Sequence, residues 1–287
     1  MFSKYFQVVD PNSIKCLACN RYCIISKNNT GFCKVRKNDN QKLVSLVYGK
    51  PVSINLDPIE KKPIYHFLPN TKTLSLGTVG CNFDCAFCQN YDISNCKNIN
   101  IEAMDYYSPD EIINIAIERK TPSISYTYTE PTIFVDYALD IMKKASSQDI
   151  KNIWVSNGYM SKEVLKDIMP HLDAINIDLK GTQKLYDELV PGIKLKHIKE
   201  NIKELHKNKI HIEITNLMIE GHNTKPEDIQ ETIDFVYSVS KDIPLHFSRA
   251  FPYYRLKNII PTKLETLRLA EKLARAKGLK NVYLGNI

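Results

Sequence analysis

Short runs of β-branched residues alternate with longer segments of helical periodicity from residue 73 to the end of the chain. The predicted strands span residues 73–79, 123–128, 152–156, 174–179, 211–217 and 244–247, with 281–284 as a seventh candidate. The predicted helices span residues 109–119, 132–146, 162–169, 195–207, 226–238 and 262–276. Strands that alternate with helices are typical of repeated βα units around a parallel sheet. We therefore expect one α/β body over residues 73–287.

Residues 1–72 lack this alternation and contain several cysteines. We expect a small, irregular, metal-binding element here, followed by a connector to the α/β body. The charged part of this connector, residues 57–67, is interpreted either as a lid over the mouth of the body or as a solvated linker.

The chain has 287 residues, 43% of them hydrophobic, which suffices for one large α/β domain with a small appendage. Its formal charge of +7 comes from lysines interspersed with acidic residues, so no concentrated basic stripe for nucleic acid is expected. Residues 1–11 carry charges and no apolar run, and no later stretch has the roughly eighteen apolar residues that span a membrane. We expect a cytoplasmic protein that binds neither nucleic acid nor a membrane.

The eight cysteines are clustered along the chain. One group consists of Cys16, Cys19, Cys23 and Cys33, a second consists of Cys81, Cys85 and Cys88, and Cys96 stands apart. Disulfides are rare in a reducing cytoplasm, so this clustering indicates metal or cluster ligands, with Cys96 as an inert thiol.

The second group forms a C-x3-C-x2-C loop directly after the first predicted strand. Three thiolates from one turn can hold three irons of a [4Fe-4S] cluster and leave the fourth iron open, whereas clusters that only transfer electrons usually have four cysteine ligands. The competing interpretation is a zinc knuckle with a fourth ligand from elsewhere, but zinc sites favour paired C-x2-C spacings. The loop predicts a [4Fe-4S] cluster with an open iron.

Five segments extend this pattern along most of the chain: 57–67 (DPIEKKPIYHF), 80–90 (GCNFDCAFCQN), 126–131 (YTYTEP), 178–181 (DLKG) and 246–249 (HFSR). With Phe87 in its aromatic position, the cysteine loop resembles that of the radical S-adenosylmethionine (SAM) superfamily. Taken together, the segments resemble the radical SAM member of the AmmeMemoRadiSam system, a group similar to pyruvate formate-lyase activating enzymes.

The resemblance implies a partial (β/α)6 barrel in which SAM binds the open iron and is cleaved to a 5′-deoxyadenosyl radical that abstracts hydrogen from a substrate. It also implies a one-electron donor such as a ferredoxin or flavodoxin. The substrate, a small molecule or a protein or peptide, is not identified by the residues. The name of the group suggests partners of the AMMECR and Memo types.

Polar groups at the predicted strand ends are suited to anchor SAM. Thr129 and Glu130 end the second strand, where the glutamate can accept hydrogen bonds from the SAM ammonium, although a loop carboxylate is the alternative. Ser156 and Asn157 end the third strand and are suited to ribose hydroxyls. Asn216, near the end of the fifth strand, is expected to border the adenine.

Four further residues are candidates for catalysis. Alternation places Asp178 and Lys180 on one face of the fourth strand. They are expected either to form part of the active-site floor or contact a cofactor or ion, or to form a structural ion pair with each other. His246 is either a substrate contact or a lumen histidine with an internal partner. Arg249 offers a guanidinium fork to a carboxylate of SAM or of the substrate.

The first cysteine group supplies four thiolates, which fit either a structural zinc or a second iron–sulfur cluster, with zinc slightly favoured by the unequal spacing. The leading functional hypothesis is a radical SAM oxidoreductase or maturase that abstracts hydrogen. The second is an activase that installs a glycyl radical on a partner protein. A non-enzymatic electron-transfer or metal-storage protein is the third, and it leaves Glu130, Asn157 and Asp178 unexplained.

Overall fold

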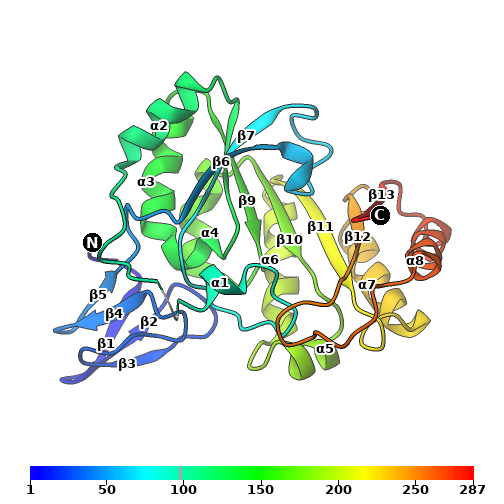
Figure 1. Ribbon diagram of the computed structural model, residues 1–287, viewed down its shortest axis with the longest axis horizontal. Helices are drawn as coiled ribbons and strands as arrows, with labels where there is room; N and C mark the ends of the chain where they lie inside the picture. The colour runs from blue at the N-terminus through cyan, green and yellow to red at the C-terminus, as the bar shows by residue number, and fades with distance from the viewer. Residues whose placement is uncertain (97–98) are drawn as a thin grey trace.

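The computed structural model describes residues 1–96 and 99–287 (Figure 1). Its main sheet has eight strands in the order β13-β12-β11-β10-β9-β8-β7-β6. The strands are β6 (Ser53–Pro58), β7 (Lys72–Gly77), β8 (Ser123–Tyr126), β9 (Lys151–Ser156), β10 (Ala174–Asp178), β11 (His211–Met218), β12 (Leu245–Arg249) and β13 (Val282–Gly285). Strands β7 to β13 are parallel, and β6 pairs antiparallel with β7. Because β6 and β13 are the two edges, the sheet forms an open, partial barrel.

Helices follow each of the strands β7 to β12, and most of them cover the outer face of the sheet, whereas the short helix Tyr91–Ser94 lies beside the cysteine loop (Figure 1). The helices are α1 (Tyr91–Ser94), α2 (Pro109–Glu118), α3 (Val135–Ser146), α4 (Lys162–Ile168), α5 (Gln183–Leu189), α6 (Leu195–Lys207), α7 (Pro226–Val239) and α8 (Leu264–Lys277), with 3-10 turns η1 (Ile59–Lys61), η2 (Pro131–Phe134) and η3 (Met169–His171). The six βα units and a last strand confirm the expected partial (β/α)6 architecture. None of the helices in residues 1–96 and 99–287 is long and apolar enough to cross a membrane.

The predicted elements agree with the structure to within a few residues, but the sequence did not predict β6, α1 or α5, and β8 is shorter than expected. Helix α5 was not expected, because seven residues are too few to display a helical period, although Leu185, Tyr186 and Leu189 are buried. Strand β8 ends earlier than predicted, since Tyr128 adopts a φ of 66°, which a continuing strand does not allow.

The N-terminal element is more regular than its sequence indicated. It contains a sheet of β1 (Phe6–Asp10), β2 (Ser13–Cys16) and β3 (Ile24–Ser26), and a hairpin of β4 (Arg36–Asp39) and β5 (Lys42–Ser45). These strands are short and partly exposed, so no apolar alternation marks them in the sequence. They lie at one end of the molecule, with α8 and β13 at the other (Figure 1).

Residues 59–67 close the amino-terminal end of the barrel. Strand β6 runs from Ser53 opposite Gly77 to Pro58 opposite Lys72, so the chain leaves it at the beginning of the parallel strands. Ile59 and Ile64 then pack against Ile153 and Ala174 from the inner face of the sheet. The segment is therefore a barrel floor, and neither the lid nor the solvated linker expected from the sequence.

Candidate functional site

The three-cysteine loop follows β7 at the carboxyl end of the parallel strands, where active sites of such sheets form. Gly80 precedes it with a φ of 94°, and a Cβ at this position would lie 2.8 Å from the carbonyl oxygen of Cys33. The Phe83 N–H donates to Sγ of Cys81 at 3.3 Å, and Sγ of Cys88 lies 3.4 Å from the Ser94 hydroxyl. A backbone N–H and a hydroxyl group thus contact two of the three sulfur atoms.

The donor set of this loop fits a [4Fe-4S] cluster. Burial raises the pKa of the Cys81 thiol, and repulsion from the Glu130 carboxylate and from the Cys85 and Cys88 thiolates raises it further, so the three sulfur atoms lie near one another. Among residues 1–96 and 99–287, no three cysteine, histidine or acidic side chains are gathered closely enough to hold one metal ion. A cubane needs no such closeness, since each thiolate binds a different iron.

Lys180 and Asp178 lie beside this loop and form an ion pair with each other, which was one of the interpretations that the sequence left open. Nζ of Lys180 is 3.0 Å from Oδ2 of Asp178 and 5.4 Å from the centre of the Phe87 ring. Burial alone would lower the pKa of Lys180, but attraction from Asp178 and the Cys85 thiolate outweighs it and raises this pKa. Burial raises the pKa of Cys85 to about 12, and the Lys180 ammonium partly opposes this effect. A fixed positive charge therefore stands next to one cluster ligand.

Glu130 is enclosed rather than open to a ligand. Its side chain is 1% exposed and accepts hydrogen bonds from Oγ of Ser156 and the N–H of Asn157, both at 2.8 Å. The N–H and hydroxyl of Thr132 donate to the same carboxylate. Burial raises the pKa of Glu130, and these donors oppose the rise. The carboxylate thus joins the start of η2 to the end of β9.

Asn157 links this carboxylate to the cysteine loop. Its Nδ2 donates to Oδ1 of Asn82 at 2.7 Å, and its Oδ1 accepts from the N–H of Tyr159 at 3.0 Å. Asn82 is 1% exposed, and its own Nδ2 has no hydrogen-bond partner in the part of the chain that the structure describes. Sequence reasoning missed Asn82, whose only signal was its place directly after Cys81.

The other expected SAM anchors hold neighbouring loops. The Thr129 hydroxyl donates to the carbonyl oxygen of Thr78 at 2.8 Å, and Nδ2 of Asn216 donates to the carbonyl oxygen of Leu179 at 2.7 Å. Thr129 is half-buried and Asn216 is buried, so both fix the backbone at strand ends that surround the loop.

His246 and Arg249 belong to opposite ends of β12. Nε2 of His246 lies 2.7 Å from Oε2 of Glu213, and its ring stacks edge-on against Tyr65 of the barrel floor. This histidine is therefore internally partnered and remote from the cysteine loop. Arg249 lies at the carboxyl end of its strand, where its Nε donates to the carbonyl oxygen of Thr262 at 2.7 Å.

Two buried charge clusters inside the barrel were not predicted. Glu213 is fully buried and accepts from the N–H groups of Tyr65 and His66 at 2.8 and 2.7 Å. Asp57 lies 2.6 Å from Nζ of Lys62 and accepts from the Tyr128 hydroxyl at 2.6 Å. The acidic and basic residues of 57–67 were the sequence signal for the second cluster, but their inward direction depends on β6.

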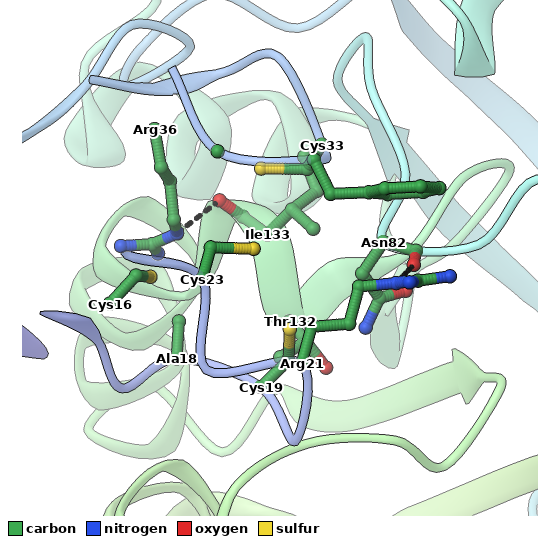
Figure 2. A pocket seen from close by; sticks show the side chains of 12 residues that line it. Cys16, Ala18, Cys19, Arg21, Cys23, Cys33, Arg36, Asn82, Thr132 and Ile133 are labelled. Carbon is green, nitrogen blue, oxygen red and sulfur yellow. Dashed lines mark hydrogen bonds between the residues drawn. The ribbon is translucent and has the colours of Figure 1, made fainter. Parts of the chain in front are cut away.

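The first cysteine group also forms one site. Cys16, Cys19, Cys23 and Cys33 line a single cavity from several sides, and Asn82 lies at its edge (Figure 2). This site therefore adjoins the C-x3-C-x2-C loop, although the two groups are far apart in the sequence.

Comparison with known proteins agrees with this geometry. The profile of the Radical SAM superfamily matches residues 75–236. The chain is 40% identical over 284 residues to Uncharacterized protein MJ0808 of Methanocaldococcus jannaschii, a match that covers 99% of this chain and 84% of that protein. It is 33% identical over 119 residues to a protein of the same organism named "Putative glycyl-radical enzyme activating enzyme MJ1632", with 40% of each chain covered.

The fold also resembles that of a solved structure from this superfamily. A radical SAM methyltransferase from Sphaerobacter thermophilus superposes with a TM-score of 0.60 at 12% identity, covering 99% of this chain and 76% of that one. The three-cysteine loop, the partial barrel and these similarities establish that the chain is an enzyme of the radical SAM superfamily.

Proposed function

We propose that the chain cleaves SAM reductively at a [4Fe-4S] cluster held by Cys81, Cys85 and Cys88, and that the 5′-deoxyadenosyl radical abstracts hydrogen from a substrate at the barrel mouth. The observation that carries this proposal is the position of the three thiols at the carboxyl end of β7, with Lys180 and Asp178 beside them. When bound, the cluster supplies an open iron for SAM and the electron that breaks its sulfonium bond.

The residues of this chain have positioning roles in the proposal. The Glu130 carboxylate fixes the turn after β8 against the end of β9, and the Thr129 hydroxyl ties this turn to Thr78 near the cysteine loop. Asn157 extends the same network to Asn82 and so to the cysteine loop. Asp178, which is only partly buried next to Lys180, is the acceptor that we assign to SAM or to the substrate. Arg249 is the cation that we assign to a carboxylate at the rim.

Product formation tests the proposal. The wild-type chain is reconstituted with iron and sulfide under anaerobic conditions, reduced with dithionite and incubated with SAM. We expect 5′-deoxyadenosine and methionine from wild type and from Cys96→Ala, and none from Cys85→Ala. A reduced wild-type sample with its cluster intact and no 5′-deoxyadenosine would contradict the proposal.

The second candidate is an activase that generates a glycyl radical on a partner protein. The similarity to a protein named as a glycyl-radical enzyme activating enzyme favours it. AMMECR- and Memo-type proteins are the partners that we would test first, with a ferredoxin or flavodoxin as the one-electron donor. An activase would transfer deuterium from a glycine-deuterated partner into 5′-deoxyadenosine and leave a protein radical detectable by electron paramagnetic resonance (EPR). Deuterium transfer from another residue or from a small molecule would favour the first candidate instead.

A further inference from the structure

The N-terminal cysteine element is docked directly onto the loop of the C-x3-C-x2-C motif. The carbonyl oxygen of Cys33 packs against Gly80, where a Cβ would come within 2.8 Å of it. Nε of Arg21, between Cys19 and Cys23, donates to the carbonyl oxygen of Asn82. Two backbone contacts therefore join the four-cysteine cavity to the residues on either side of Cys81.

A buried cation, Arg36, lines this cavity and is held in place by internal partners. Arg36 is 1% exposed and donates from Nε to the carbonyl oxygen of Ile133 at 3.0 Å, as Figure 2 shows, and from Nη2 to Asp136 at 2.8 Å. Burying a guanidinium beside thiols is costly unless an anionic group compensates it, and Asp136 is one such group.

The spacing of the four thiols differs from that of a zinc site. A single zinc ion draws four sulfurs into one tight tetrahedron, but no three metal-binding side chains among residues 1–96 and 99–287 are gathered that closely. Cys81, Cys85 and Cys88 are not gathered that closely either, and the Radical SAM superfamily, to which this loop belongs, binds a [4Fe-4S] cubane. Cys16, Cys19, Cys23 and Cys33 line one cavity, in which each thiolate would bind a different iron of a single cluster.

The orphaned amide of Asn82 supplies an independent observation. This side chain lines the four-cysteine cavity, is almost fully buried, and has an Nδ2 without an acceptor in the described part of the chain. A buried donor without a partner destabilises the folded chain. Cluster sulfides and thiolate sulfurs accept hydrogen bonds of this kind, so a bound iron–sulfur cluster would satisfy the amide.

We infer that Cys16, Cys19, Cys23 and Cys33 hold a second [4Fe-4S] cluster, and that it relays electrons to the cluster at Cys81, Cys85 and Cys88. One electron leaves a low-potential donor of the ferredoxin or flavodoxin class, reduces the second cluster from 2+ to 1+, and moves on to the first cluster. No bond is formed or broken and no proton moves in this step. The relay rests on the proposed function, whereas the presence of the second cluster does not.

Metal content tests the second cluster. Three proteins are reconstituted anaerobically: wild type, the Cys81→Ala/Cys85→Ala/Cys88→Ala variant, and the Cys16→Ala/Cys19→Ala/Cys23→Ala/Cys33→Ala variant, with Cys96→Ala as the matched control. We expect about eight irons per chain in wild type and the control, and about four in each multiple variant. The triple variant should also give a [4Fe-4S]1+ EPR signal that SAM does not change. Zinc without iron in the triple variant, or four irons in wild type, would overturn the inference.

A second measurement keeps the test valid if a multiple variant does not fold. Mössbauer spectra of 57Fe-labelled wild type should show iron in two [4Fe-4S] environments, of which only one responds to SAM; a single environment would overturn the inference. For the relay, the Cys16→Ala/Cys19→Ala/Cys23→Ala/Cys33→Ala variant should lose far more 5′-deoxyadenosine formation with reduced flavodoxin than with dithionite, whereas Cys96→Ala should lose neither. Equal loss with both reductants in a folded protein would overturn the relay, and absence of product from wild type would count against the proposed function alone.

Discussion

Nδ2 of Asn157 donates a 2.7 Å hydrogen bond to Oδ1 of Asn82, the residue that directly follows the first cysteine of the C-x3-C-x2-C loop. The N–H of Asn157 donates in turn to the buried Glu130 carboxylate. The ends of β8 and β9 thereby control the position of a loop that follows β7, and this coupling supports the first prediction.

Replacing Asn157 with alanine should loosen the cysteine loop. The change leaves Oδ1 of Asn82 buried without its donor, which costs about 1–3 kcal/mol of unfolding free energy. We expect lower cluster occupancy and faster loss of iron in air, measured by iron release and by urea denaturation of the metal-free protein. Asn208→Ala, which removes an exposed amide bonded to Glu204, is the control. Equal behaviour of the two variants would contradict the assigned role.

Lys180 should affect SAM chemistry more than cluster assembly. Its ammonium is next to Cys85 and Asp178, whereas the three ligands come from a different loop. Lys180→Met should keep the iron content, weaken SAM binding followed by EPR titration, and slow 5′-deoxyadenosine formation. Lys184→Met, at an exposed position of α5, is the control. Wild-type SAM binding and turnover in Lys180→Met would remove Lys180 from the site.

Glu213 should make the protein sensitive to acid. Burial alone would raise its pKa, but hydrogen bonds from His211, His246 and the N–H of His66 lower it to about 2. Because the unfolded-state pKa is the higher one, near its model value of 4.5, the stabilisation is complete above that pH. It is lost as the pH falls from there towards 2.

We expect the metal-free wild type to lose about 3 kcal/mol of unfolding free energy over this interval, measured by urea denaturation at each pH. Glu213→Gln should be less stable at neutral pH, and its unfolding free energy should fall less steeply as the pH is lowered. The control is Glu265→Gln, on the exposed side of α8. If the unfolding free energy of Glu213→Gln fell with pH as steeply as that of wild type, other groups would be the cause of the acid sensitivity.

Lys194 should contribute to recognition of the electron donor. A surface hollow shares Arg21, Cys23 and Phe32 with the four-cysteine cavity and adds Lys194 and His197, with no carboxylate among its lining residues. Acidic donors are attracted to such a surface, and the attraction is screened by salt. Lys194→Glu should therefore slow 5′-deoxyadenosine formation with flavodoxin, measured at low salt, and leave the dithionite-driven rate unchanged.

The control for this charge reversal is Lys196→Glu, two residues further along the chain and outside the hollow. A deficit in Lys194→Glu that persists with dithionite, or one that Lys196→Glu reproduces, would show that the donor does not dock at Lys194.

Sequence patterns predicted the barrel strands well because each is a buried β-branched run bounded by a periodic helix, as in β9 and β10. They predicted the cysteine loop because its chemistry is local. They did not predict β6 or the inward direction of Asp57, since an edge strand with exposed residues carries little apolar alternation. The partnership of His246 with Glu213 was left open by the sequence, because residues from neighbouring strands meet only through the register of the sheet.

The proximity of the two cysteine groups was also beyond sequence reasoning. Cys33 and Gly80 meet through the packing of the N-terminal element on the barrel, a contact between residues far apart along the chain. Glu130 shows the same limit: the sequence placed it at the end of the second strand, but β8 ends at Tyr126, and the Glu130 carboxylate points inward to hydrogen-bond with Ser156 and Asn157. Strand-end positions are readable from sequence, whereas side-chain direction after a turn is not.

The central claim is that the cluster at Cys81, Cys85 and Cys88 has an open iron that binds SAM. Electron–nuclear double resonance of the reduced wild type with SAM labelled with 15N at the amino group tests it most directly, because hyperfine coupling requires the nitrogen to be bound at the cluster. We predict 15N coupling in wild type and in Cys96→Ala, and none in the Cys81→Ala/Cys85→Ala/Cys88→Ala variant. Absence of 15N coupling in a fully reduced wild-type sample with its clusters intact would contradict the account.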